Sequence, residues 1–368
     1  MEMLLHHKFI AIVCLSGLLI LPCRPAAAGK EHTGERDSSR LYSGLQTPEP
    51  GTRLNPIADL ILHYANTLVV YPDSVKKKYE KRLYWGEPRM NRILDTTVVR
   101  EDYAIPVRVY YPRKPEKCNP SSIIVYFHGG GFVFGNNDTY DGLLKKLAHV
   151  TRCIVISAEY RLSPGVHYPV AVNDCYFVLQ WVASHMKLLG AEGKKIGVAG
   201  DSAGGNLAAV MTLMSRDKGG PPIAWQVLYY PSTTMRDTMY RSRAYFAGSY
   251  GRFYMLSEDF MMQVKKDYLG AYPDDRDPYV SPLDARLTPN LPPALIVTAK
   301  CDPLRDEGGD YAHRLAQKGV PVMYREAKGM IHGFISFYPL LRQGRKALRL
   351  TAGFINELNQ PMPQMKKH

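Results

Sequence analysis

The sequence predicts an α/β fold, with a mostly parallel, doubly wound sheet and a largely helical cap. Short apolar runs alternate with helical segments through much of the 368 residues, as in parallel sheets whose strands are joined by helices. Residues 123–127 form a continuous apolar run, typical of a strand buried on both faces. Residues 231–291 contain no clear strand but many Tyr, Phe, Met and Arg residues. We interpret this interval as a cap over the carboxyl edge of the sheet, where such sheets bind ligands.

The first 28 residues have the pattern of a secretory signal peptide. Basic residues precede an apolar run from Phe9 to Leu21, and Ala26 and Ala28 supply the small residues of a cleavage site. The run is short for a membrane span. We therefore expect cleavage after Ala28 and export as a secreted, periplasmic or lumenal protein. An uncleaved anchor with a lumenal catalytic domain is the alternative. Residues 29–54 are polar and predict a flexible leader.

The segments that follow predict a helix, a hairpin and then the alternating core. Apolar residues at helical spacing predict an amphipathic helix over 55–84, and Val and Tyr at alternating positions predict an antiparallel hairpin from 97–100 and 105–111. The expected core strands are 123–127, 153–158, 196–199, 225–230, 295–298 and 320–324, and the expected helices are 141–150, 170–189, 205–214, 308–318 and 345–358. We assign 55–92 to an N-terminal cap segment, 93–231 and 286–360 to the core, 232–285 to a cap insertion and 361–368 to a tail.

Composition restricts the function classes. Hydrophobic residues make up 45% and charged residues 22%, as in ordinary globular proteins, and the net charge is +13. The Lys and Arg residues are scattered and form no nucleic-acid module, so we expect a solvated basic surface and no nucleic-acid partner. Peripheral contact with a membrane or lipid surface stays open. The sequence does not settle the oligomeric state.

The cysteines do not predict a metal site. Four remain after the signal segment (Cys118, Cys153, Cys175 and Cys301), and none has the Cys or His spacing of a metal site. Their pairing is open, although Cys153 and Cys175 lie in apolar surroundings that favour buried thiols. Asn137 begins an Asn-Asp-Thr sequon, which matters only in a host that glycosylates.

The residues Gly200-Asp201-Ser202-Ala203-Gly204 lie between a strand-like run and a helix-like run. A Gly-x-Ser-x-Gly motif in that context is typical of a nucleophile elbow, a sharp turn that exposes the serine above the sheet. Small neighbours are needed because the turn is strained. An ordinary Gly/Ser turn is the alternative. We interpret Asp201 as a turn and helix-cap residue.

A serine nucleophile needs a base and an acid, which in elbow-type enzymes follow it in the order acid, then histidine. His313 lies within a predicted helix and His368 ends the chain, which leaves His332, in a loop after the last strand. Asp302 stands at the carboxyl end of a predicted strand and is the favoured acid. The nearby Asp306 and Glu307 precede Gly308, where we expect a helix to start, and are interpreted as capping residues.

The residues His128-Gly129-Gly130-Gly131 directly follow the strand 123–127. Glycines allow backbone N–H groups to approach a developing oxyanion closely. We predict an oxyanion hole formed by the N–H groups of Gly129, Gly130 and Ala203. Gly131 supports the turn, and a structural hydrogen bond that holds the loop is the preferred role for His128.

Taken together, these motifs resemble the hormone-sensitive lipase-like branch of the α/β-hydrolases, which includes arylacetamide deacetylases and bacterial family IV esterases. The resemblance covers residues 95 to 340. Gly165 departs from it, because relatives usually carry Glu at that position, and this bears on hydrogen bonding near the cap. The matching pieces are His128–Phe132, Tyr160–Pro164, Gly200–Gly205, Ser281–Leu283, Leu291–Pro293, Asp302–Gly308 and His332–Phe334.

The resemblance implies a carboxylic ester hydrolase with Ser202 as nucleophile, His332 as base and Asp302 as orienting acid, acting on a small-molecule ester without metal or cofactor. We expect short- to medium-chain acyl esters as substrates. The alternatives are a lipase, or an acylglycerol or sterol-ester deacetylase, at a membrane surface, and a non-catalytic small-molecule receptor on the same fold. The cap aromatics line an acyl pocket or pack within the cap: Tyr245, Phe246, Tyr250, Phe253 and Tyr254.

Overall fold

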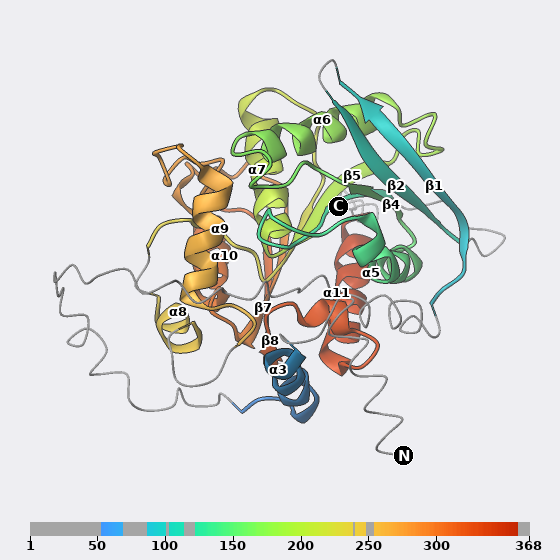
Figure 1. Cartoon of the computed structure of the whole chain (residues 1–368). Helices are drawn as coiled ribbons and strands as arrows, with labels where there is room; N and C mark the ends of the chain where they lie inside the picture. The colour runs from blue at the N-terminus through green and yellow to red at the C-terminus, as the bar shows by residue number, and fades with distance from the viewer. Residues whose placement is uncertain are drawn as a thin grey trace, which may run out of the picture.

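The fold is an eight-stranded sheet with helices on both faces (Figure 1). A computed structural model describes residues 53–68, 87–100, 103–113, 122–237, 240–247 and 254–359. The predicted signal peptide and tail, and nearly all of the predicted leader, lie outside these ranges. No helix in the described part of the chain is long and apolar enough to cross a membrane.

The strand order is β1-β2-β4-β3-β5-β6-β7-β8. β1 and β2 form the predicted antiparallel hairpin, β2 also pairs antiparallel with β4, and all later neighbours are parallel. The carboxyl ends of the parallel strands therefore lie at one edge of the sheet. The strands are β1 (Met90–Val99), β2 (Ala104–Pro112), β3 (Ser122–Phe127), β4 (Ile154–Ala158), β5 (Lys195–Asp201), β6 (Gln226–Tyr229), β7 (Ala294–Cys301) and β8 (Val322–Ile331).

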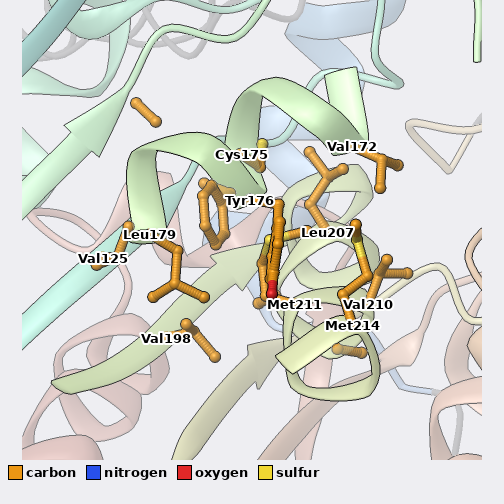
Figure 2. Close-up of a cluster of buried hydrophobic side chains, with 14 of the residues drawn as sticks. Val125, Val172, Cys175, Tyr176, Leu179, Val198, Leu207, Val210, Met211 and Met214 are labelled. Carbon is orange, nitrogen blue, oxygen red and sulfur yellow. The ribbon is translucent and has the colours of Figure 1, made fainter. Parts of the chain in front are cut away.

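The helices form two layers because successive residues of a buried strand face opposite sides. Ile123 and Val125 of β3 belong to the same core layer as α6, α7 and α10, whereas Ile124 and Tyr126 belong to the layer of α3, α5 and α11. Figure 2 shows the first layer, where α6 and α7 meet Val125 and Val198 of the sheet. The helices are α3 (Pro56–Leu68), α5 (Asn137–Thr151), α6 (Val170–Ser184), α7 (Ala203–Asp217), α8 (Arg241–Phe246), α9 (Glu258–Leu269), α10 (Arg305–Gln317) and α11 (Arg342–Asn359).

The cap interval contains helices and no strand in its described residues, as predicted. α8, α9 and a short 3-10 helix (Pro282–Asp284) lie between β6 and β7. In Figure 1, α8 and α9 lie on the side of the molecule away from the β1–β2 pair. The described part of the predicted helix 55–84 forms α3, and residues 69–84 lie outside the described ranges. α3 packs on β8, and the Asn55 N–H donates to the carbonyl of Gly329 (3.0 Å).

The predicted elements form, with shifted ends. β8 runs seven residues beyond the predicted strand and ends at Ile331, directly before His332. α10 begins at Arg305, so Asp306 and Glu307 lie in its first turn. The prediction that they cap a helix starting at Gly308 was wrong, because the N-cap residue is Leu304 and has no side-chain cap.

Three of the four cysteines that follow the signal segment are buried in the core: Cys153, Cys175 and Cys301. Cys118 lies outside the described residues. Asn137 of the sequon is 5% exposed at the start of α5. A glycan must extend into solvent from the side-chain nitrogen, so the folded chain does not present this asparagine as an acceptor.

Candidate active site

Ser202 lies at the turn between β5 and α7, and it has φ 55° and ψ −121°. This backbone conformation is rare for a residue with a side chain. Gly200 and Gly204, on either side of Ser202, have no room for a side chain. A Cβ on Gly200 would meet the carbonyl of Gly204 at 2.1 Å, and a Cβ on Gly204 would meet the carbonyl of Phe127 at 2.0 Å. The turn has the geometry predicted for a nucleophile elbow.

His332 and Asp302 lie beside Ser202 although they are distant in sequence. His332 Nε2 is 2.9 Å from Ser202 Oγ, and His332 Nδ1 is 2.8 Å from Asp302 Oδ2. Asp302 is fully buried and its other oxygen accepts the N–H of Leu304 (2.9 Å). A carboxylate accepts only, so Nδ1 carries the proton and Nε2 is free to accept from the serine hydroxyl. The three predicted residues therefore form one hydrogen-bonded chain.

The residues that the sequence analysis rejected as base or acid are not part of this hydrogen-bonded chain. His313 is exposed on α10, and His368 is outside the described residues. Asp306 pairs with Arg305 and accepts the N–H of Ser242 (2.8 Å). The ring of Tyr230 packs edge-on against His332, with centroids 4.8 Å apart, and helps to fix the imidazole.

One predicted oxyanion donor is already occupied. The N–H of Gly129 donates to Asp201 Oδ1 (3.0 Å) and to Tyr140 Oη (2.9 Å), so the assignment of Gly129 to the hole was wrong. Within the described part of the chain, the N–H groups of Gly130, Gly131 and Ala203 donate to no protein acceptor. These three residues also line the cavity around Ser202.

Hydrogen bonds to two successive carbonyls orient the free N–H groups of the loop. His128 Nδ1 donates to the carbonyl of Gly129 (2.8 Å), and the N–H groups of Val133 and Phe134 donate to the carbonyl of Gly130 (3.1 Å each). In a trans peptide the carbonyl and the N–H point in opposite directions. The N–H groups of Gly130 and Gly131 are therefore turned away from these bonds. The structural role predicted for the His128 ring is present in the structure.

His128 is neutral in this environment. It is completely buried, and burial lowers the pKa of its imidazole to about 4, although the hydrogen bond to Gly129 opposes this effect. A neutral ring with its proton on Nδ1 is the form that the bond to the Gly129 carbonyl requires.

The prediction that Asp201 caps a helix was wrong. α7 has no side-chain cap at its start. The Asp201 carboxylate, which is 3% exposed, instead accepts the hydroxyl groups of Tyr126 (2.8 Å) and Tyr140 (3.0 Å) and the N–H of Gly129. Its contacts are with the loop and the elements behind it.

A cavity with about 990 Å³ of empty space, part of it open solvent, surrounds Ser202. The core supplies the Gly129–Phe132 loop, His332 and Gly333. The cap supplies mainly apolar side chains and two basic residues: Thr234, Met235, Arg243, Leu256, Phe260, Met261, Met262, Val264 and Lys265. No described residue of α3 lines this cavity.

Five aromatic residues of the cap were expected either to line an acyl pocket or to pack within the cap, and the structure describes three of them. Phe246 is buried, with its ring 4.8 Å from that of Tyr245 and 5.0 Å from that of Tyr254. These rings pack within the cap and do not line the cavity. Tyr250 and Phe253 lie outside the described residues.

Glu307 is a cavity residue that the sequence reasoning missed. Its side chain is 1% exposed, and its Oε1 accepts the N–H of Thr233 (2.7 Å). Burial raises the pKa of the carboxyl to about 8, so the protonated form predominates at neutral pH. Helical spacing on α10 could have revealed it, because Glu307 lies on the same face as Tyr311, which is buried in the core.

No group of three or more His, Cys, Asp or Glu residues in the described ranges could hold a metal ion. The hydrogen-bonded Ser-His-Asp chain supplies a nucleophile and a base, and the adjacent N–H groups supply donors for an oxyanion, as acyl transfer requires.

Known proteins agree with this geometry. Residues 124–336 match a family described as having the alpha/beta hydrolase fold. The chain is 38% identical to Esterase LipI of Mycobacterium tuberculosis over 247 residues (67% of this chain and 76% of that protein), and 32% identical to Ethyl acetate hydrolase of Pseudomonas putida over 252 residues (68% and 77%). A hyperthermophilic esterase from Pyrobaculum calidifontis superposes with a TM-score of 0.76 at 39% identity, covering 83% of this chain and 99% of that one. The chain therefore belongs to the hormone-sensitive lipase-like, family IV branch of the α/β-hydrolases and is a carboxylic ester hydrolase.

Proposed function

We propose that this chain hydrolyses short- to medium-chain acyl esters through a covalent acyl-enzyme on Ser202. The observation that carries the proposal is the hydrogen-bonded chain from Ser202 through His332 to the buried Asp302. The free N–H groups beside it support the second requirement, a site for the oxyanion.

In the proposed mechanism, Ser202 Oγ attacks the ester carbonyl as His332 Nε2 takes the hydroxyl proton. Asp302 holds the ring in the required tautomer and stabilises the imidazolium. The N–H groups of Gly130, Gly131 and Ala203 bind the oxyanion. His332 then protonates the leaving alcohol, and a water activated by the same histidine releases the acid.

The acyl range is supported by the cavity wall. Phe134, Leu256, Phe260 and Val264 offer apolar surface to an acyl chain, and each buried methylene contributes about 0.8 kcal/mol. The relative from Pseudomonas putida is named for an ester of a two-carbon acid, which supports activity at the short end. A series of p-nitrophenyl esters from acetate to laurate should show kcat/KM rising to a maximum at a short or medium chain and then falling. A maximum at laurate would instead favour the lipase alternative.

The decisive variant is Ser202→Ala, assayed on p-nitrophenyl butyrate. Removing the hydroxyl removes the nucleophile, so the rate should fall by about 10⁴-fold or more. Ser184→Ala is the matched control, because it deletes an exposed hydroxyl on α6 and should retain full activity. Undiminished hydrolysis by Ser202→Ala would overturn the proposal.

The alternatives gain less support. The relatives reported above are an ester hydrolase and esterases, and the histidine that a catalytically inactive receptor could dispense with lies in hydrogen-bonding distance of the serine. The names of the relatives and the position of His332 therefore support a hydrolase of small esters more than a membrane-surface deacetylase or a receptor.

We also propose that the chain is exported through the secretory pathway, with cleavage after Ala28. The apolar run Phe9–Leu21 and the residues Ala26 and Ala28 support this proposal. Intact-mass measurement of the protein from its native host should give a chain that begins at Gly29. A membrane-bound chain that retains residues 1–28 would favour the uncleaved anchor.

A further inference from the structure

The strongest feature that the mechanism does not use is the buried carboxylate of Asp201, directly before Ser202. Three donors from three different parts of the fold converge on it: the hydroxyl of Tyr126 on β3, the hydroxyl of Tyr140 on α5 and the N–H of Gly129 in the loop. A side-chain amide offers one acceptor oxygen and two N–H donors, whereas a carboxylate offers two acceptor oxygens. The set of donors therefore fits aspartate in particular.

The two tyrosines that donate to Asp201 keep their protons. Tyr126 and Tyr140 are buried, and burial together with the nearby Asp201 charge raises the pKa of each phenol well above its usual value, so both remain donors. Burial raises the pKa of the Asp201 carboxyl, and the two tyrosine hydrogen bonds and the nearby His332 oppose that rise. Hydrogen bonds to an ionised acceptor are about twice as strong as neutral ones.

The network holds one particular peptide group, the one that joins His128 to Gly129. Its N–H donates to Asp201 and Tyr140, and its carbonyl accepts the hydroxyl of Tyr160 (2.7 Å). Both polar edges of the peptide are therefore held. The fit is close, since a Cβ on Gly129 would meet Asp201 Oδ2 at 2.7 Å and Tyr140 Oη at 2.9 Å.

The next peptide group carries the N–H of Gly130. Its carbonyl, that of Gly129, accepts His128 Nδ1, and the preceding peptide is the one that Asp201 holds. Rotation of either group would move the Gly130 N–H away from Ser202. A misplacement of about 1 Å at a reacting centre can cost about 100-fold in rate.

We propose that Asp201 is a positioning residue of the oxyanion hole: with Tyr126 and Tyr140, its carboxylate holds the His128–Gly129 peptide so that the N–H of Gly130 faces the oxyanion. The inference rests on the proposed function. The Asp201 carboxylate bonds to Tyr126, Tyr140 and Gly129 rather than to Ser202 Oγ or His332, so it acts through the loop.

The test compares Asp201→Ala, Asp201→Asn and Tyr140→Phe on p-nitrophenyl butyrate. Asp201→Ala removes both carboxylate oxygens, so kcat should fall by about 10²–10³-fold, the cost of losing one oxyanion donor, while KM changes little. Asp201→Asn keeps one acceptor oxygen and should recover part of the loss. Tyr140→Phe keeps both carboxylate oxygens and removes one hydroxyl, which donates to Asp201 and accepts the N–H of Gly129, so its loss should be the smallest of the three.

A transition-state readout separates positioning from a general folding defect. A trifluoromethyl ketone adds to the serine and forms an oxyanion, so its inhibition constant should weaken across the variants in parallel with kcat/KM. Tyr229→Phe is the matched control, because it removes a buried hydroxyl that bonds to Thr351 (2.6 Å) and not to Asp201 or the loop; it should leave both quantities unchanged.

The outcomes also separate this inference from the proposed function. If Ser202→Ala stays active, the function fails. If Ser202→Ala is inactive while folded Asp201→Ala keeps kcat within about threefold of the wild type, only the role of Asp201 is overturned. Loss of activity in Asp201→Ala without weaker ketone binding, or an equal loss in Tyr229→Phe, would likewise overturn it.

Discussion

The cavity has two walls that differ in construction. The sheet wall carries Asp302, His332 and the loop at Gly130 on or next to strand ends, and the side chains of its acid and base are at most 5% exposed. The cap wall comes mainly from α9, with Arg243 of α8 and residues of the adjoining loops, and its basic groups form partly exposed pairs: Arg243 with Glu258 and Lys265 with Asp275 (2.7 Å). Surface pairs of this kind contribute about 0–1 kcal/mol each.

This difference suggests a division of labour. A wall made of strand ends and close backbone contacts can hold reacting groups to within a fraction of an ångström. A wall of side chains such as Phe260 and the half-exposed Met262 can adjust to different acyl chains. Changes in the sheet wall should therefore lower kcat, and changes in the cap wall should alter chain-length preference.

The largest effect should come from the acid. Asp302→Asn replaces the carboxylate that fixes the His332 tautomer and should lower kcat by about 10⁴-fold. Asp306→Asn is the matched control on the same segment, where the carboxylate pairs with Arg305, and its kcat should stay within about threefold. Steady-state kinetics on p-nitrophenyl butyrate measure both. Equal losses would contradict the choice of Asp302.

The next effect concerns the loop. Gly130 has φ +113°, and a Cβ there would meet the carbonyl of Phe134 at 2.0 Å. Gly130→Ala should displace the N–H and lower kcat by about 10²–10³-fold. Gly190→Ala also introduces strain, since Gly190 has φ +67°, but a Cβ there has no neighbour within 4 Å. Its kcat should match the wild type, and a wild-type rate for Gly130→Ala would contradict the assigned hole.

A smaller effect concerns stability against pH. The pKa of Glu307 is about 8 in the folded state, whereas a glutamate in an unfolded chain has a pKa of about 4.3. Between these values the folded state binds more protons, so the free energy of unfolding should fall as pH rises from 4.5 to 8. Glu307→Gln keeps an oxygen for the Thr233 N–H but does not titrate, so its thermal midpoint should fall less than that of the wild type over this range. If the thermal midpoints of the two proteins fell equally with pH, the raised pKa of Glu307 would be contradicted.

The smallest effect should come from the cap. Phe260→Ala enlarges the cavity and should lower kcat/KM for p-nitrophenyl octanoate by about 5–20-fold, since the ring no longer buries the chain, with little change for acetate. Leu188→Ala, at a site 76% exposed on the surface, is the control. An equal loss on acetate and octanoate would contradict the division between the two walls.

The triad could be predicted because each of its residues follows a parallel strand, in the order along the chain that this fold requires. Parallel strands bring their carboxyl ends to one edge, so Ser202 after β5, Asp302 after β7 and His332 after β8 had to lie at the same edge of the sheet. Few histidine and acidic residues follow those strand ends, so the candidates for the base and the acid were few.

The details of the oxyanion hole could not be predicted in the same way. Three successive glycines have similar freedom, and which N–H groups face the cavity depends on contacts from distant residues: Tyr160 and His128 hold the carbonyls, and Asp201 takes the N–H of Gly129. Glu307 was missed for a related reason, because a carboxylate before a glycine looks like a helix cap until its burial is known.

The most direct test of the central claim is covalent labelling of Ser202. The protein is treated with a p-nitrophenyl alkylphosphonate, digested, and mapped by mass spectrometry. We predict one adduct per chain, on the peptide that contains Ser202, with release of one equivalent of p-nitrophenol and none in Ser202→Ala. An adduct on another residue, or p-nitrophenol release that persists in Ser202→Ala, would contradict the claim that Ser202 is the nucleophile.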